Sequence, residues 1–149
     1  MKKIFGFIAI LLCAVLLVGC GNDGGKDLVE CSSSVSEDGT TSESKMVGTF
    51  EDDKLVKMEV SSTIKMSGDF TQEDFDLGYS FFEMGAAMMD TMDGVTAKTS
   101  KTNNSMTLTA TIDVKAMSDE AVEAYFEDST VGTKAEFKAY ATEEGLTCK

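Results

Sequence analysis

Two stretches of this chain alternate apolar and polar side chains with a period of two, and this pattern limits the fold more than any other feature. The positions between the apolar ones are polar, chiefly Lys and Thr. Such alternation is typical of an antiparallel strand with one buried face and one solvent face. The apolar positions are Val56, Met58, Val60, Ile64 and Met66 in the first stretch, and Met106, Leu108, Ala110, Ile112 and Val114 in the second.

Turn signals place further strands around these two. We expect reversals at residues 36–39, which end in Gly, at Asp52-Asp53, and at Asn103-Asn104, because Gly, Asp and Asn tolerate turn conformations. A disordered linker is the alternative for the Ser- and Thr-rich stretch 32–44. The expected strands cover residues 28–34, 40–50, 56–66, 95–101, 105–114 and 146–148.

Three helices are predicted from their caps. Thr71 and Asp74 have the spacing of a capping box, and Gly94 is placed to end the helix that follows. Ser118 caps a short second helix, and Thr133 with Glu136 opens a third, which ends at Gly145. On the first helix, one half of the helical wheel holds Leu77, Phe81, Phe82, Met84, Met88, Met89 and Met92. We expect this half to pack into the core, since Met commonly fills irregular cores; Cu(I) binding by its thioethers is the alternative.

The element order is therefore βββ-α-ββ-α-α-β. Strands and helices segregate rather than alternate, which favours an α+β domain with an antiparallel sheet and helices packed on one of its faces. We expect one such domain over residues 28–149.

The first residues look like a targeting segment. Lys2 and Lys3 precede an uncharged apolar run, and Leu17-Val18-Gly19-Cys20 resembles the lipobox of bacterial lipoproteins. The resemblance implies that residues 1–19 are a signal peptide and that acyl chains anchor Cys20 to the extracytoplasmic face of the cell membrane. Residues 20–27 would form the short tether. An ordinary secretory signal and a single membrane span are the alternatives.

Two cysteines remain in the expected domain, one near each end. Cys31 and Cys148 form an even pair in a chain expected outside the cytoplasm, and they lie in the first and last expected strands. A disulfide between them is therefore predicted. Two free thiols are the alternative in a reducing environment.

The composition excludes several kinds of chemistry. The sequence has no His, so it offers no Ser-His-Asp triad and no imidazole metal ligand. Its formal net charge of −13 opposes binding to nucleic acid, whose phosphates attract basic proteins. Acidic clusters at residues 90–94 and 51–53 lack the ligand spacing of a calcium loop. We expect no enzyme activity, no cofactor, no metal site and no nucleic-acid partner.

Short motifs along the chain carry a family resemblance. These are residues 50–57 (FEDDKLVK), the helix end Met92-Asp-Gly-Val95, the hairpin leading to Ile112-Asp-Val-Lys115, and the closing residues 145–149 (GLTCK). In this order they resemble the YehR-type family of small bacterial lipoproteins. The resemblance implies an α+β lipoprotein of unassigned activity and supplies no catalytic residues.

Two functions fit these expectations. The first is a non-enzymatic binding module at the cell envelope, which contacts an envelope protein. The second is a carrier whose small apolar ligand lies between the Met-rich helix and the sheet.

Overall fold

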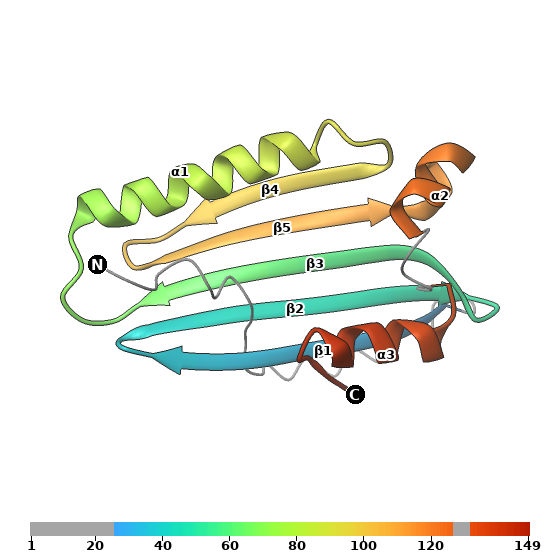
Figure 1. Ribbon diagram of the computed structural model, residues 1–149, viewed down its shortest axis with the longest axis horizontal. Helices are drawn as coiled ribbons and strands as arrows, with labels where there is room; N and C mark the ends of the chain where they lie inside the picture. The colour runs from blue at the N-terminus through green and yellow to red at the C-terminus, as the bar shows by residue number, and fades with distance from the viewer. Residues whose placement is uncertain (1–25, 127–131) are drawn as a thin grey trace.

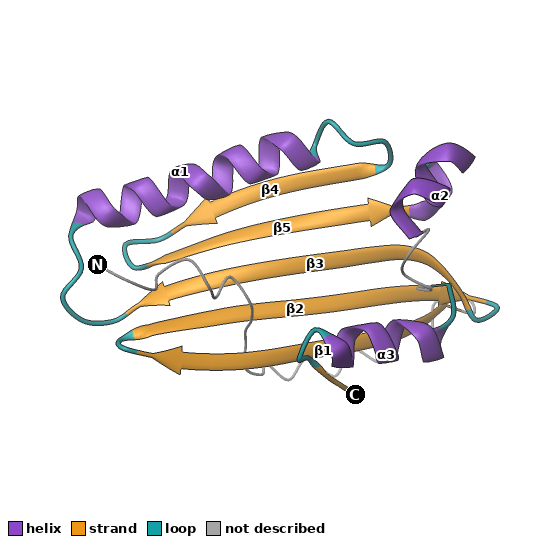
Figure 2. Cartoon of the chain, viewed as in Figure 1, coloured by secondary structure: helices purple, strands orange, loops and turns teal. Residues whose placement is uncertain are grey.

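A computed structural model describes residues 26–126 and 132–149 as a single sheet with helices (Figure 1, Figure 2). The element order is the one predicted, with an additional 3-10 turn at Val114–Ala116. The strands are β1 (Lys26–Glu37), β2 (Thr40–Glu51), β3 (Lys54–Met66), β4 (Val95–Lys101), β5 (Ser105–Asp113) and β6 (Thr147–Cys148). The helices are α1 (Gln72–Met89), α2 (Asp119–Phe126) and α3 (Lys134–Glu143).

The sheet is antiparallel throughout, and its strand order is β4-β5-β3-β2-β1-β6. Two tight turns join β1, β2 and β3. Asp38 and Gly39 have φ of 46° and 75°, and Asp52 and Asp53 have φ of 49° and 62°. Two successive residues with positive φ match the twist of a hairpin, and short Asp side chains tolerate that conformation. The predicted fold class and the predicted reversals are confirmed.

A register shift in β3 corrects one part of the predicted alternation. Thr49 pairs with Lys57, but the next residue, Phe50, pairs with Leu55. The irregularity puts Leu55 into the core and leaves Val56 partly exposed, whereas the sequence pattern had assigned Val56 to the apolar face. A bulge of this kind inserts one residue and so reverses the facing of every residue beyond it.

Both long helices lie on the same face of the sheet. α1 contacts β4 and β5, and α3 contacts β1, β2 and β6 (Figure 1). The buried residues form two clusters on that face. The larger lies beneath α3 and includes Phe50, Met58, Ile112 and Phe137; the smaller lies beneath α1 and consists of Phe75, Phe82 and Met106.

The other face of the sheet is polar. Thr63 and Thr107 hydrogen-bond across β3 and β5 at 2.9 Å, and Lys45 pairs with Glu30 at 2.9 Å. An exposed ion pair such as Lys45 with Glu30 adds little stability. The polar positions of the alternating strands lie on this face, and both buried clusters lie on the opposite face.

All three helix starts have the predicted caps. The Thr71 hydroxyl accepts from the Asp74 amide, the Ser118 hydroxyl from the Ala121 amide, and the Thr133 hydroxyl from the Glu136 amide. β1 already begins at Lys26, within the stretch 20–27 assigned to the tether. β1 thus begins two residues before residue 28, where the domain was predicted to start.

Candidate functional site

The outward side of α1 is apolar, and this corrects the prediction for that helix. The residues that α1 buries are Phe75, Phe82 and Ala86. Five residues predicted to pack into the core are exposed instead: Leu77 by 59%, Phe81 by 58%, Met84 by 55%, Met88 by 68% and Met92 by 43%. We call these five residues the helix stripe; four lie on α1, and Met92 lies three residues beyond its last residue, Met89. Of the predicted set, Phe82 is buried and Met89 is partly buried, as expected.

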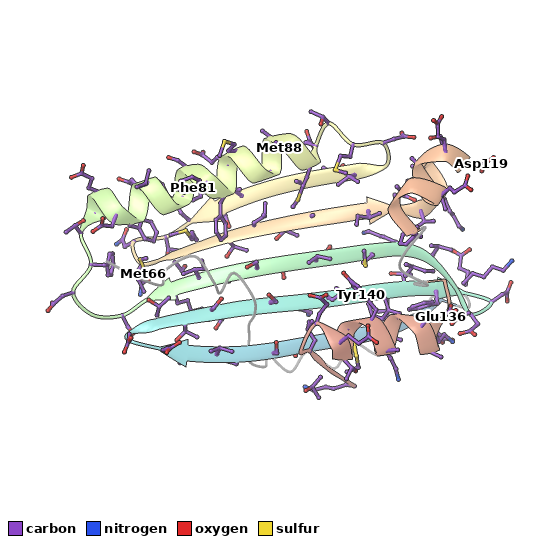
Figure 3. All side chains as sticks on the ribbon, viewed as in Figure 1. Met66, Phe81, Met88, Asp119, Glu136 and Tyr140 are labelled. Atoms are coloured by element: carbon purple, nitrogen blue, oxygen red, sulfur yellow. A yellow bond between two sulfur atoms is a disulfide. The ribbon has the colours of Figure 1, made fainter. Side chains whose placement is uncertain are left out.

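The sequence carries two apolar stripes on this helix, and the prediction merged them. Phe75, Tyr79, Phe82, Ala86 and Met89 recur at spacings of four and three, and so do Leu77, Phe81, Met84 and Met88. The two sets are offset by two residues, which places them on opposite sides of a helix. The spacing of Leu77, Phe81, Met84 and Met88 is the sequence feature from which an exposed apolar surface could have been predicted. Figure 3 labels Phe81 and Met88, two of the exposed residues, on α1.

A close approach explains which of the two stripes faces the sheet. Gly78 lies over the buried Met106, and a Cβ built at Gly78 would be 3.2 Å from the Met106 Cε. The absence of a side chain at Gly78 lets the helix backbone come near the sheet on that side. The stripe with Phe75 and Phe82 lies on this side, and the helix stripe is left outside.

The helix stripe contains a shallow depression at its C-terminal end. Its volume is about 700 Å³, and Gly85 is one of its lining residues; a Cβ there would meet nothing within 4 Å. It is open to solvent rather than a closed ligand cavity. Its lining residues are Met84, Gly85, Ala87, Met88, Met89, Thr91 and Met92.

A second, smaller pocket lies on the apolar face of the sheet, where Met89 of α1 meets β3, β4 and β5. Its volume is about 250 Å³. Its walls are apolar apart from one serine. The lining residues are Val60, Ser62, Met89, Val95, Leu108, Ala110 and Ile112.

The acidic residues of α1 next to β4 fasten the helix to that edge strand. Asp76 accepts a hydrogen bond from the Lys101 Nζ at 2.9 Å, and this bond holds the pKa of Asp76 below its ordinary value. The same ammonium lies 4.5 Å from the centre of the Tyr79 ring. Asp90 accepts from the Ala97 amide at 3.2 Å. These contacts hold α1 against β4 through residues that are not part of the helix stripe.

The acidic cluster at residues 90–94 is used for hydrogen bonds within the fold. Asp93 accepts from the Ser118 amide at 2.8 Å, which ties the end of α1 to the start of α2 and lowers the pKa of Asp93. Gly94 has the predicted left-handed conformation, with a φ of 72°, but it does not end the helix: α1 ends at Met89, with Asp90 as its C-cap. A Cβ at Gly94 would be 2.3 Å from the Met117 Cγ, so Gly is required by packing as well as by φ.

The cluster at residues 51–53 also has structural partners. Glu51 pairs with Lys115 at 2.5 Å, and the Asp53 carboxylate accepts from the Lys134 amide at 3.3 Å. Within residues 26–126 and 132–149, no three His, Cys, Asp or Glu side chains gather as a metal site would require.

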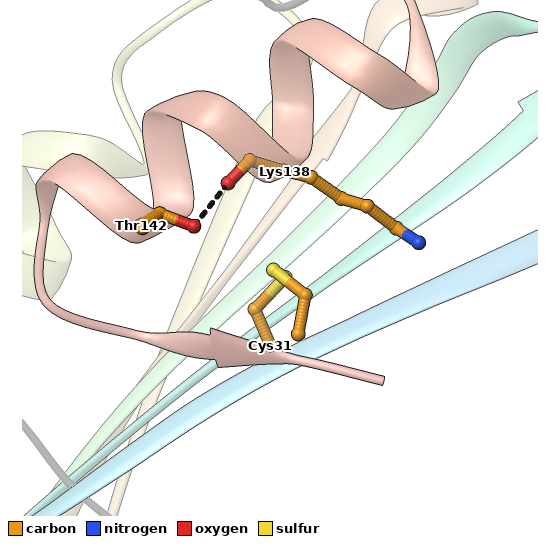
Figure 4. The surroundings of a disulfide bond; sticks show 4 residues. Cys31, Lys138 and Thr142 are labelled. Atoms are coloured by element: carbon orange, nitrogen blue, oxygen red, sulfur yellow. Dashed lines mark hydrogen bonds between the residues drawn. A yellow bond between two sulfur atoms is a disulfide. The ribbon is translucent and has the colours of Figure 1, made fainter.

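The two domain cysteines are joined in the structure. Cys31 of β1 pairs with Cys148 of β6 in the strand register, and their sulfur atoms form a disulfide that spans 117 residues. α3 runs over this bond, as Figure 4 shows with Lys138 and Thr142. Cys31 is fully buried in the same cluster as Phe137 and Ala141. The disulfide therefore lies under α3, away from the helix stripe.

The predicted lipidation site, Cys20, and the whole expected signal peptide lie outside the described residues. In the described part of the chain, the helices are too short or too polar to cross a membrane.

Comparisons with known proteins give the fold and no activity. No family model matches the chain, and no curated protein matches its sequence. The NMR structure of the Escherichia coli YehR protein is similar, with 19% identity and a TM-score of 0.56 over 83% of this chain and 90% of that one. An NMR structure of a Streptococcus pneumoniae TIGR4 protein has 9% identity and a TM-score of 0.53, with 100% of both chains covered. The resemblance to YehR-type proteins is thus confirmed at the level of the fold.

Proposed function

We propose that this protein is a lipid-anchored binding module on the extracytoplasmic face of the cell membrane, and that the helix stripe is its contact surface. The observation that carries the proposal is the exposure of four large apolar side chains on one side of α1, with a fifth, Met92, just beyond the end of the helix. Soluble proteins seldom leave such a contiguous patch uncovered unless it binds something.

The position of the anchor fits a contact made close to the membrane. From Cys20 to Lys26 the chain can span at most about 20 Å. Lys26 pairs with Glu51 at the end of the sheet where β4 also begins, just after α1 ends (Figure 1). An acyl-anchored Cys20 would therefore keep this end of the sheet near the bilayer. The Met88 end of the helix stripe is at the same end, on the side of β4 and β5, which β2 and β3 separate from β1.

A role without catalysis is part of the proposal. Catalytic groups are commonly desolvated and have strongly perturbed pKa values. Among the described residues no polar or charged residue is buried. The lowered carboxyl pKa values belong to surface contacts, such as Asp76 with Lys101 and Glu136 with the cap of α3.

Site-specific crosslinking in cells of the source organism tests the contact surface. A photoreactive amino acid at position 88 should give a discrete crosslinked product, and the product should disappear when Phe81→Glu is added. The matched control is position 28, because Leu28 and Met88 are both 68% exposed. Equal products from both positions, or none from position 88, would contradict the proposal.

Membrane fractionation tests the anchor separately. The wild-type chain should be recovered in the membrane fraction and should incorporate a labelled fatty acid. The Cys20→Ser variant should lose the label. A label retained by that variant would place the acylation elsewhere.

The sheet pocket supports a second candidate function, a carrier of a small apolar ligand. Its volume of about 250 Å³ is slightly below the range of roughly 300–1,000 Å³ usual for ligand sites. Native mass spectrometry of the protein after incubation with envelope extract would detect a bound small molecule. Ala110→Leu should abolish that added mass, because the larger side chain fills the pocket.

A further inference from the structure

We infer that the helix stripe binds a cationic amphipathic helix of a partner protein. This inference rests on the proposed function and names the chemistry of its partner. Three observations support it: the acidic residues around the helix stripe, the spacing of the stripe residues along α1, and the depression at the C-terminal end of the stripe.

The segment that carries the helix stripe is acidic and has no basic residue. Residues 72–93 contain no Lys, Arg or His, and their charged residues are Glu73, Asp74, Asp76, Glu83, Asp90 and Asp93. Lys101 of β4 neutralises Asp76, and the remaining acids leave the surface around the stripe negative. A partner with basic residues beside its apolar contacts would gain both apolar burial and attraction between opposite charges.

The same charges disfavour the other occupants. A second copy of this chain would bring two acidic helices against each other without a cation from either one. An anionic lipid surface would be repelled in the same way, and the whole chain has a formal net charge of −13. Charge complementarity therefore selects a cationic partner.

The geometry of the stripe selects a helix. Leu77, Phe81, Met84 and Met88 are spaced by four, three and four residues, so they form a nearly straight apolar ridge along α1. The depression above Gly85 is bordered by Met84 and Met88, and it can receive one apolar side chain from a helix packed against this ridge. Methionine side chains adapt to varied partners, which suits this kind of helix recognition.

Binding of designed peptides tests the inference directly. The protein is the mature chain, residues 20–149 with Cys20→Ser, so that no acyl chain competes for the stripe; every contact described above lies within residues 26–149. The probe is a fluorescent amphipathic peptide of Leu and Lys as long as α1, 18 residues. One comparison peptide has Glu in place of every Lys, and another has the Leu and Lys residues scrambled so that no apolar face forms.

The Leu/Lys helix should bind at least tenfold more tightly than either comparison peptide. Met88→Glu should weaken its binding at least tenfold, although the new carboxylate would by itself attract the cationic peptide. Leu28→Glu adds the same charge at an equally exposed site and should leave the affinity within about twofold. Binding should also weaken as salt rises, since the Debye length is only about 10 Å at 0.1 M.

Each contrary result has a distinct meaning. Equal binding of the Leu/Glu helix would overturn the cationic partner while leaving the helix stripe as a contact surface. Equal binding of the scrambled peptide, or no effect of Met88→Glu, would overturn the helix and the site together. Dimerisation abolished by Met88→Glu, or binding to anionic vesicles lost in that variant, would replace the proposed partner with a second copy or a membrane. Loss of the position-88 crosslink in cells would count against the proposed function itself.

Discussion

α1 and α3 lie on the same face of one sheet, yet their outer sides are different. α3 buries Phe137 and Ala141 and exposes residues such as Lys138 and Glu143 to solvent. α1 buries Phe75, Phe82 and Ala86 and also exposes the large apolar side chains of the helix stripe. α3 has none of the large exposed apolar side chains found in the described residues, whereas α1 carries four of them. The helix stripe is the best candidate for function.

The two helices also differ in how firmly they are held. α3 covers the larger cluster and the Cys31–Cys148 disulfide, whereas α1 covers a cluster of three buried residues. Local stability follows buried contacts and crosslinks, so the α3 side should be the last to open. Four predictions test this contrast.

Removal of the disulfide should have the largest effect. The double variant Cys31→Ser/Cys148→Ser frees a loop of 117 residues, and the chain-entropy model assigns about 5 kcal/mol to a loop of this length. Denaturant unfolding measures the loss, and reduction of the wild-type protein should reproduce it. An unchanged unfolding midpoint on reduction would show that the bond does not constrain the unfolded chain.

Truncation of one aromatic residue on each helix compares the two sides directly. Phe137 is fully buried and packs edge-on against the Phe50 ring, with 5.6 Å between the ring centroids. Phe137→Ala should therefore lower the free energy of unfolding by about 3–5 kcal/mol. Phe81 is exposed, and Phe81→Ala should change that free energy by no more than about 0.5 kcal/mol. A large loss from Phe81→Ala would mean that the helix stripe is part of the core.

Acid should weaken the α3 side through its cap. Hydrogen bonds from the Thr133 hydroxyl and the Thr133 amide lower the pKa of Glu136 below its ordinary value of 4.5. A lowered carboxyl pKa gives stability that is present above pH 4.5 and is lost as the pH falls through the folded-state pKa.

The measurement is the unfolding midpoint as a function of pH. Glu136→Gln should flatten that dependence below pH 4.5, because the amide oxygen still accepts hydrogen bonds but does not titrate in this range. Glu143→Gln, at an exposed position of the same helix, is the matched control. Equal pH profiles for the wild-type and Glu136→Gln proteins would contradict the prediction.

The smallest expected effect is a gain on α1. A Cβ at Gly85 would meet nothing within 4 Å, and Gly85→Ala should stabilise the protein by about 0.5–1 kcal/mol, because Ala loses less backbone entropy in a helix. Gly78→Ala is the control on the sheet side, where the new Cβ meets Met106 at 3.2 Å and removes that gain. Thermal unfolding of both variants measures the difference, and equal gains would show that α1 does not approach the sheet closely at Gly78.

Much of the fold was predictable because its signals are local. Turns at Asp38-Gly39 and Asp52-Asp53, the caps at Thr71 and Thr133, and the alternation in β5 each depend on residues a few positions apart. The capping boxes show the limit of such signals. The Glu136 carboxylate reaches the Thr133 backbone amide at 2.9 Å, whereas the Asp74 carboxylate, one methylene shorter, accepts from the Thr71 hydroxyl.

The candidate site was predicted only in part. The methionines of α1 were recognised as a group, but the prediction placed Met84, Met88 and Met92 in the core. Their spacing predicts an apolar side of a helix, and a second apolar side, with Phe75 and Phe82, was present in the same residues. Hydrophobicity alone does not determine which of two apolar sides of a helix faces the core.

The strands, the turns, the helix starts and the α+β class could be predicted from the sequence, because their signals lie in residues that are near neighbours in the chain. The Cys31–Cys148 pairing, predicted from the sequence, is confirmed. Two other features could be read only from the folded chain: which side of α1 faces the sheet, and where β3 shifts its register at Leu55. These features depend on contacts between segments far apart in sequence, such as Gly78 on Met106. Only one side of α1 can pack on the sheet. The side with Phe75, Gly78 and Phe82 packs there, and the helix stripe is therefore exposed.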